Sequence, residues 1–299
     1  MNILQSIFTD YYELHPRPAV IENVNKMIHC GDPSYGGAMY GCPHCGNLKF
    51  VPFRCKSRFC PSCGNKYNQL RSFHMSCKLV SCVHRHCVFT IPAELRVYFL
   101  EDRTLLDCLF HSVRDVVLRM FSKMNKTENF TPGLICILHT FGRDLKWNPH
   151  IHDLISEGGA GNITPWRPVK HFDYNFLRNA FHKVLLEQLT SRIGPSFRKV
   201  KNEMYTKHED NKTVTETIPA LDFIQKLIVH IPEKHFKMLR YYGVYAKHHK
   251  QEKKLLVLEV YHKKRHKQRH GESNILSFVM SFFISSLLYT ISDDLRNFL

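Results

Sequence analysis

Two cysteine pairs near the N-terminus have the residue type and the spacing of metal ligands. Cys42 and Cys45 form one Cys-x2-Cys pair, and Cys60 and Cys63 form a second pair. Each pair presents two thiolates on one side of a turn, and two such pairs complete the tetrahedral shell that zinc prefers. A closed shell of four thiolates leaves no open position for a substrate, so we expect a structural zinc at these four residues.

Two further cysteines lie close to these pairs. Cys30 and Cys55 are compatible with a second metal held together with His29 or His44, with a share in the first site, or with plain burial. Basic residues interleave the same segment, and we expect them to contact a DNA backbone: Arg54, Lys56 and Arg58.

A His-x-His motif is the second chemical signal. In a β-strand, residues i and i+2 share one face, so His150 and His152 point one way and Ile151 points the other. Two imidazoles on one face suit a catalytic divalent cation, because they leave positions open for phosphate oxygens. His139, in the preceding strand of a predicted hairpin, lies roughly opposite Ile151 and is the candidate third ligand.

The pattern of apolar residues predicts the elements that position these motifs. A helical lead-in over 1–29 precedes a metal-stapled module over 30–66. The remaining elements are predicted as helices over 67–81, 102–125, 173–189, 221–231 and 234–247, strands over 86–92, 134–141 and 150–156, and a polar loop over 201–217.

The charge of the chain favours a polyanionic partner. Its 299 residues carry a formal net charge of +16, and residues 262–270 form a nearly continuous cationic run. From that run we expect these residues to bind DNA phosphates: Lys263, Lys264, Arg265, Lys267 and Arg269. The apolar stretch 275–291 is predicted as a buried or partner-facing helix, so no stable membrane partner is expected. The N-terminus lacks the pattern of a secretory signal, which favours a cytoplasmic, nucleoid-associated protein.

Four segments, taken in order, resemble one family. They are 57–64 (SRFCPSCG), 88–96 (VFTIPAELR), 139–142 (HTFG) and 149–152 (PHIH). The chain resembles the rolling-circle transposases of the IS91 type, which belong to the HUH (His-hydrophobe-His) endonucleases. The resemblance implies an N-terminal zinc-binding domain and a catalytic domain with an antiparallel, ferredoxin-like sheet. It also implies that His150 and His152 hold Mg²⁺ or Mn²⁺ while a tyrosine attacks single-stranded DNA and forms a 5′-phosphotyrosine link.

The tyrosine is the point at which this sequence departs from the family. The helix that carries the catalytic tyrosine is expected between Tyr205 and Glu216, and its pattern is not found there. The chain is therefore interpreted as internally deleted near 205–216. On the predicted helix 234–247, Tyr241 and Tyr245 share one face and are candidate nucleophiles, with structural aromatic residues as the alternative.

Together these observations predict an α+β protein with three parts. They are a zinc module over 1–66, an HUH-type transposase domain over 67–260, and a basic and apolar tail over 261–299. The predicted function is DNA transposition by nicking and rejoining single-stranded element ends. The alternative functions are a non-catalytic, zinc-dependent DNA-binding remnant of such an enzyme, or an RNA-binding zinc protein.

Overall fold

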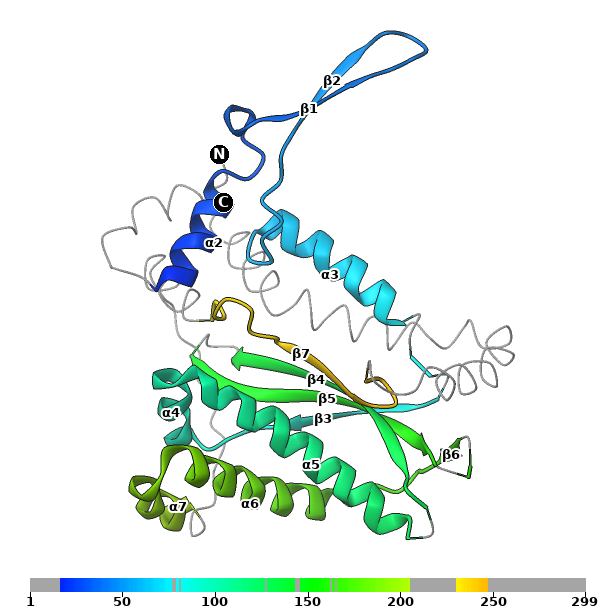
Figure 1. Ribbon diagram of the computed structural model, residues 1–299, viewed down its shortest axis with the longest axis vertical. Coiled ribbons are helices and arrows are strands. Elements are labelled where there is room, and N and C mark those ends of the chain that lie inside the picture. Colours follow the sequence, from blue (N-terminus) through cyan, green and yellow to red (C-terminus); the bar gives the residue numbers. More distant parts are fainter. Residues whose placement is uncertain are drawn as a thin grey trace, which may run out of the picture. The chain divides into compact units, whose positions relative to one another are not determined.

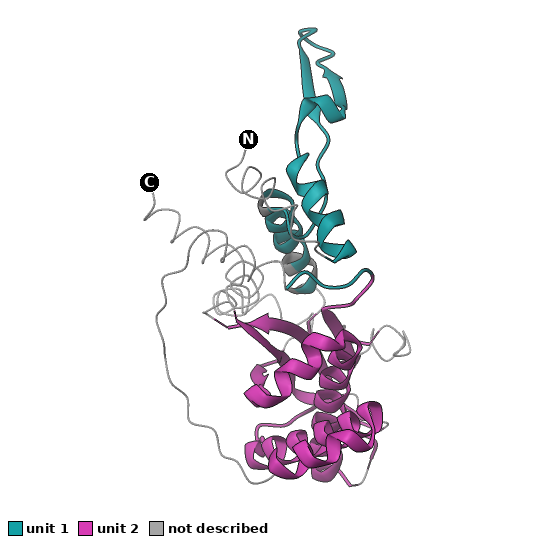
Figure 2. Ribbon diagram, turned by 90° about the vertical axis from the view of Figure 1, so that its left-hand side faces the viewer, with its two compact units in different colours: residues 1–78, 218–234, 270–299 teal, residues 79–217, 235–269 magenta. Residues whose placement is uncertain are grey.

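The computed structural model describes residues 17–76, 79–80, 82–126, 128–142, 146–161, 163–164, 166–204 and 230–246. The chain divides into two compact units, which Figure 2 shows in teal and magenta. Unit 1 comprises residues 1–78, 218–234 and 270–299, and unit 2 comprises residues 79–217 and 235–269. The predicted basic run and apolar tail, and nearly all of the predicted segments 201–217 and 221–231, lie outside the described residues.

The described residues of unit 1 form two helices and a β-hairpin. Helix α2 (Pro18–Ile28) begins at a proline, whose fixed φ suits the first helical position, and helix α3 spans Pro61–Ser76. Between them, strands β1 (Gly37–Gly41) and β2 (Leu48–Pro52) pair antiparallel, and a 3-10 turn (Pro33–Tyr35) precedes β1. Helix α3 therefore starts inside the second cysteine pair, six residues before the predicted helix.

The described part of unit 1 has a small buried core. Val20, Val24 and Met27 lie on one side of α2 at helical spacing and pack with Cys60 and Ile231. The Arg17 guanidinium holds the segment 231–233 near the start of α2, because it donates to the backbone oxygen of Ile231 at 2.9 Å and pairs with Glu233.

Unit 2 is built on an antiparallel sheet with the strand order β3-β5-β4-β7. These strands are β3 (His84–Phe89), β4 (Thr131–Phe141), β5 (Trp147–Ala160) and β7 (Leu239–Gly243), and the short strand β6 (Arg167–Pro168) pairs with the end of β5. Strand β5 lies between β3 and β4, which therefore run parallel to each other, as in a split β-α-β unit.

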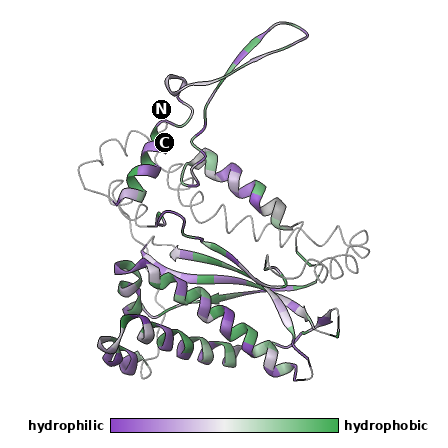
Figure 3. Ribbon diagram, viewed as in Figure 1, coloured by the Kyte–Doolittle hydropathy of each residue, from purple (hydrophilic) through white to green (hydrophobic). Residues whose placement is uncertain are grey.

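Helices pack on one face of this sheet (Figure 1). The two longest are α5 (Leu106–Met124) and α6 (Tyr174–Ile193), where the Asp173 carboxylate caps α6 by accepting from the Phe176 N–H at 2.9 Å. Figure 3 shows hydrophobic and hydrophilic residues along both helices, as expected for helices with one buried side. The shorter elements are α4 (Arg96–Glu101), α7 (Arg198–Met204) and the 3-10 turns Ala93–Leu95, Arg103–Leu105 and Pro195–Phe197.

Strand alternation gives the two faces of the sheet different chemistry. Leu138 of β4 pairs with Ile151 of β5, and both are buried in the core under α5 and α6. The next pair along, His139 with His150, therefore points to the opposite face. The core consequently fixes which face carries the histidines.

The predicted α+β class is confirmed, as are the β4–β5 hairpin and the helices α5 and α6. The predicted helix over 234–247 is wrong, because residues 239–243 form the edge strand β7 along β4. Adjacent tyrosines suit an extended strand, and pairing with β4 overrides the helical spacing that the sequence suggested. Within the described part of the chain, no helix is long and apolar enough to cross a membrane.

Candidate metal sites

A cluster of four cysteines lies in unit 1. The sulfur atoms of Cys30, Cys55, Cys60 and Cys63 all lie within 4.8 Å of one another. The Sγ atom of Cys30 is 3.6 Å from the Sγ atoms of both Cys60 and Cys63. Four thiols at this separation form the donor set of a closed, structural zinc site.

Hydrogen bonds prepare one of these thiols to lose its proton. Burial opposes ionisation of Cys30, but the Cys55 N–H and the neighbouring thiols donate to its sulfur and lower its pKa to about 7. Burial raises the pKa of Cys60 and Cys55. Gly64 allows the tight turn around Cys60 and Cys63, because a Cβ at that position would lie 2.2 Å from the Arg58 backbone oxygen.

The structure brings together a different set of cysteines from the predicted zinc ligands Cys42, Cys45, Cys60 and Cys63. Cys42 and Cys45 are exposed in the turn between β1 and β2, and they are not part of the four-cysteine cluster. The register of the hairpin explains this, because Gly37 pairs with Pro52 at its base and Gly41 pairs with Leu48 next to the turn. Cys30 and Cys55 flank the base, whereas five residues of strand, about 17 Å, lead to the turn.

The hairpin turn nevertheless has the local form of a metal knuckle. The backbone N–H groups of Cys45 and His44 donate to the Cys42 sulfur and lower the pKa of that thiol. Arg54, Lys56 and Arg58, the predicted DNA contacts of this module, are exposed beside the four-cysteine cluster.

A cluster of three histidines lies in unit 2, on the sheet face opposite α5 and α6. Ligating nitrogens of His139, His150 and His152 all lie within 4.8 Å of one another. His139 pairs directly with His150, one residue away from the predicted position opposite Ile151. The difference matters, because a partner of Ile151 would point into the core instead of toward His150 and His152.

Hydrogen bonds orient the two rings of the His-x-His motif. The Nδ1 atom of His150 lies 2.7 Å from the Asn148 backbone oxygen and must donate to it, since a carbonyl only accepts. The lone pair of His150 is then on Nε2, which faces the Nε2 atom of His152 at 3.0 Å. The Nδ1 atom of His152 lies 2.8 Å from the Nε2 atom of His86 on β3.

Burial keeps these imidazoles neutral. Burial and, to a smaller extent, the neighbouring histidines together lower the pKa of His139 to about 3 and that of His152 to about 2. Burial also lowers the pKa of His150. Neutral imidazoles are the form that binds metal, so the cluster is ready to accept a cation at neutral pH.

The two candidate tyrosines occupy different environments. Tyr241 pairs with Ile135, which alternation places on the histidine face of the sheet. Tyr245 is buried, donates to the Nε2 atom of His84 at 2.6 Å and accepts from the Val80 N–H at 3.3 Å. Burial raises the pKa of the Tyr245 phenol far above its ordinary value.

Comparisons with known proteins find two transposase family models that match this chain. Residues 3–91 match the model of the transposase zinc-binding domain. Residues 133–209 and 196–253 match a second model, of a transposase family, in two overlapping segments. The chain is also 27% identical to the transposase for insertion sequence element IS801 of Pseudomonas savastanoi pv. phaseolicola, over 296 residues that cover 77% of this chain and 71% of that protein.

This chain belongs to the IS91-type transposases. A second relative, the Sinorhizobium fredii protein y4qJ, which is named as a transposase, is 24% identical over 54% of this chain and 41% of its own length. No solved structure matches this transposase significantly.

The sequence analysis missed one residue that contacts the histidine cluster. It places His86 only at the start of a strand, although His86 lies on the strand next to His152 in the transposase sheet. Its position three residues before Phe89, which packs into the core, is the signal that could have found it, because alternation then places His86 on the histidine face.

Proposed function

We propose that this transposase cleaves and rejoins single-stranded DNA at a divalent cation held by His139, His150 and His152. The observation that carries the proposal is the convergence of three neutral imidazoles on a sheet face that the helices α5 and α6 leave uncovered. Three protein ligands leave coordination positions for phosphate oxygens. Imidazole nitrogens suit transition metals better than Mg²⁺, so we favour Mn²⁺ over Mg²⁺. The cation would polarise the phosphate that is attacked.

Hydrogen bonds within the chain would hold His150 and His152 in the tautomers that cation binding requires. His150 donates to Asn148, and His152 would donate from Nδ1 to His86, so that both Nε2 lone pairs point to one position. In the reaction, a tyrosine oxygen bonds to phosphorus while the bond from phosphorus to the 3′ oxygen breaks. The tyrosine loses its proton, and the leaving oxygen takes one up to become a 3′-hydroxyl.

Tyr241 is better suited to the role of nucleophile than Tyr245. Tyr241 shares the sheet face of the histidines, whereas the Tyr245 hydroxyl is already hydrogen-bonded to His84 and to the Val80 N–H. The Tyr245 ring also fills the space above Gly133, where a Cβ would lie 2.4 Å from it. We therefore infer a structural role for Tyr245.

A second candidate function is that of a DNA-binding remnant without a nucleophile. The broken match to the transposase family favours it, because its two segments overlap at 196–209, next to the predicted deletion at 205–216. The alignment with the IS801 transposase also runs over 296 positions while covering 77% of this 299-residue chain. Part of that relative therefore has no counterpart here.

Incubation of labelled single-stranded element ends with Mn²⁺, resolved on a denaturing gel, tests both candidates. The proposal predicts a covalent protein–DNA adduct that is lost in Tyr241→Phe and in the double variant His150→Ala/His152→Ala. Tyr245→Phe should keep the adduct, and so should His171→Ala, which removes an exposed histidine outside the cluster. DNA binding without cleavage in the unsubstituted protein would reject the enzyme and support the remnant.

A further inference from the structure

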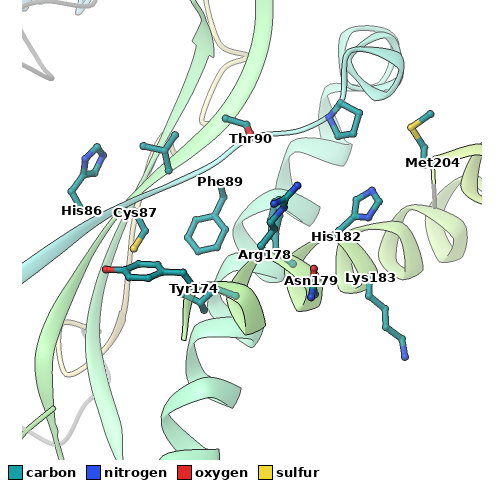
Figure 4. Close-up of a pocket in the computed structure, with 14 residues that line it drawn as sticks. His86, Cys87, Phe89, Thr90, Tyr174, Arg178, Asn179, His182, Lys183 and Met204 are labelled. Carbon is teal, nitrogen blue, oxygen red and sulfur yellow. The ribbon is translucent and has the colours of Figure 1, made fainter. Parts of the chain in front are cut away.

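A groove runs between strand β3 and helix α6 in unit 2. It has a volume of about 900 Å³, and its lining includes His86 and Thr90 from the β3 side and Tyr174, Arg178 and His182 from the α6 side. Figure 4 shows Arg178 and His182 extending from α6 toward the β3 segment. Strand β3 forms an edge of the described sheet, so this groove follows a strand that has a sheet neighbour on one side only.

The groove is suited to a polyanion. Arg178 and Lys183 supply two cationic side chains, both exposed, and no aspartate or glutamate is among the described residues that line it. Neither cation forms an ion pair within the described part of the chain. A bound phosphate would therefore not have to displace a carboxylate from either cation.

An aromatic ring is fixed at one end of the groove. Tyr174 is 53% exposed, and its hydroxyl accepts from Arg85 at 2.7 Å. Arg85 is itself held by Glu157 at 2.6 Å and by the Lys170 backbone oxygen at 3.0 Å. An exposed ring that is already held in place offers a stacking surface at a low entropic cost, and stacking on aromatic rings is how proteins bind single-stranded bases.

The groove reaches the histidine cluster through one residue. His86 lines the groove and also contacts His152 through the 2.8 Å hydrogen bond. The groove lies on the α6 side of the sheet and the cluster on the opposite face, so a chain of phosphates would pass around the edge strand β3 at His86 to reach the position that the three imidazoles surround. No residue of unit 1 is needed for this path, since all of these residues belong to unit 2.

We propose that the β3–α6 groove binds the single-stranded DNA that flanks the phosphate at the histidine cluster, with Arg178 and Lys183 on phosphates and Tyr174 stacked on a base. The inference rests on the proposed function, because it takes the histidine cluster as the reaction centre. The inference adds to that centre a groove that binds the flanking single-stranded DNA.

The experiment measures DNA affinity in the zinc-loaded full chain without added divalent cation, so that no cleavage occurs. Fluorescence anisotropy of a labelled single-stranded oligonucleotide is recorded across a range of salt concentrations. Arg178→Ala/Lys183→Ala is compared with Arg119→Ala/Lys126→Ala, a double variant that removes the same charge from exposed positions outside the groove.

Because Arg178→Ala/Lys183→Ala neutralises two fewer phosphates, the slope of log K against log salt should fall by about 1.4, which is roughly 25-fold in affinity at 0.1 M salt. The control variant should keep the slope of the unsubstituted protein. Tyr174→Ala should weaken binding about tenfold without changing the slope, and Tyr174→Phe should keep the affinity because it keeps the ring. An unchanged slope in Arg178→Ala/Lys183→Ala would overturn the proposal and favour an extended peptide along the β3 edge.

A separate measurement keeps this inference distinct from the proposed function. Binding of Mn²⁺ alone, followed by electron paramagnetic resonance, should be the same in Arg178→Ala/Lys183→Ala and in the unsubstituted protein. Absent Mn²⁺ binding in the unsubstituted protein would reject the proposed reaction centre. Normal Mn²⁺ binding with an unchanged salt slope would reject only the groove.

Discussion

Among the described residues, the cysteine cluster of unit 1 belongs to a core of five buried hydrophobic residues, whereas the histidine cluster of unit 2 lies on a sheet whose core contains 29. The four cysteines come from the flanks of a hairpin and the start of a helix, and Cys60 is itself one of the five core residues. The three histidines come from the middle of paired strands. The first site therefore depends on its metal to bring its ligands together, and the second is positioned by the fold alone.

The difference has separate consequences for the structural zinc and for the cation that we propose at the histidine cluster. The five buried residues described for unit 1 give the four-cysteine cluster little apolar support, so we expect zinc binding to supply part of the folding free energy of this unit. A sheet with a large core fixes its ligands in advance, so a cation there can bind and leave without unfolding the domain. The two units should therefore respond differently when a metal ligand is removed.

Removal of zinc should have the largest effect. Structural zinc sites supply on the order of 10 kcal/mol of apparent binding free energy, so Cys60→Ser should unfold unit 1 and leave unit 2 folded. Hydrogen exchange followed by mass spectrometry should show lost protection in α2 and α3 but not in β4 or α5. Cys42→Ser is the matched control and should keep unit 1 folded, and equal loss in both variants would show that the hairpin turn is part of the zinc site.

Substitution of Asp153, a buried residue of unit 2, should change how the stability of this unit depends on pH. The Asp153 carboxyl group is fully buried on the core side of β5, and burial raises its pKa to about 7. The folded state therefore binds a proton that the unfolded state releases above about pH 4, and stability falls as the pH rises from about 4 to 7. Asp153→Asn should stabilise unit 2 at pH 8 by up to about 4 kcal/mol and flatten this pH dependence. Thermal unfolding across that pH range measures both effects. If stability depended on pH in the same way in Asp153→Asn as in the unsubstituted protein, the raised pKa of Asp153 would be contradicted.

Substitution of His86 should weaken metal binding without unfolding unit 2. With a cation bound, His86 would accept the hydrogen bond that fixes the ring of His152, and loss of such a partner typically costs about 10- to 100-fold in metal affinity. His86→Ala should show this loss in a calorimetric titration with Mn²⁺, and His86→Gln should recover part of it because its amide oxygen also accepts. Val88→Ala, an exposed neighbour on the same strand face, should bind Mn²⁺ normally.

The sequence predicted the histidine site better than the cysteine site, for a physical reason. Alternation along a strand is a local rule, so His150 and His152 could be placed on one face before the sheet was known. The ligands of the cysteine cluster depend on the pairing register of a hairpin, which brings Cys30 and Cys55 together across 25 residues and leaves Cys42 and Cys45 in its turn.

The environments of the two tyrosines also depend on strand pairing that the local sequence does not reveal. The spacing of Tyr241 and Tyr245 fits a helix, but pairing with β4 makes residues 239–243 a strand. No local pattern could show that Gly133 leaves room for the ring of Tyr245, or that the Tyr245 hydroxyl is hydrogen-bonded to His84 and Val80. Both facts depend on residues more than 100 positions away in the chain.

A count of the two metals in one preparation tests most directly whether the sheet builds a metal site of its own. Elemental analysis should give one zinc per chain, and an electron paramagnetic resonance titration should give one bound Mn²⁺. We expect His150→Ala/His152→Ala to lose the Mn²⁺ while keeping the zinc and the thermal stability of unit 2. Retention of Mn²⁺ binding in that double variant, or unfolding of unit 2 on its loss, would contradict a metal site that is positioned by the fold alone.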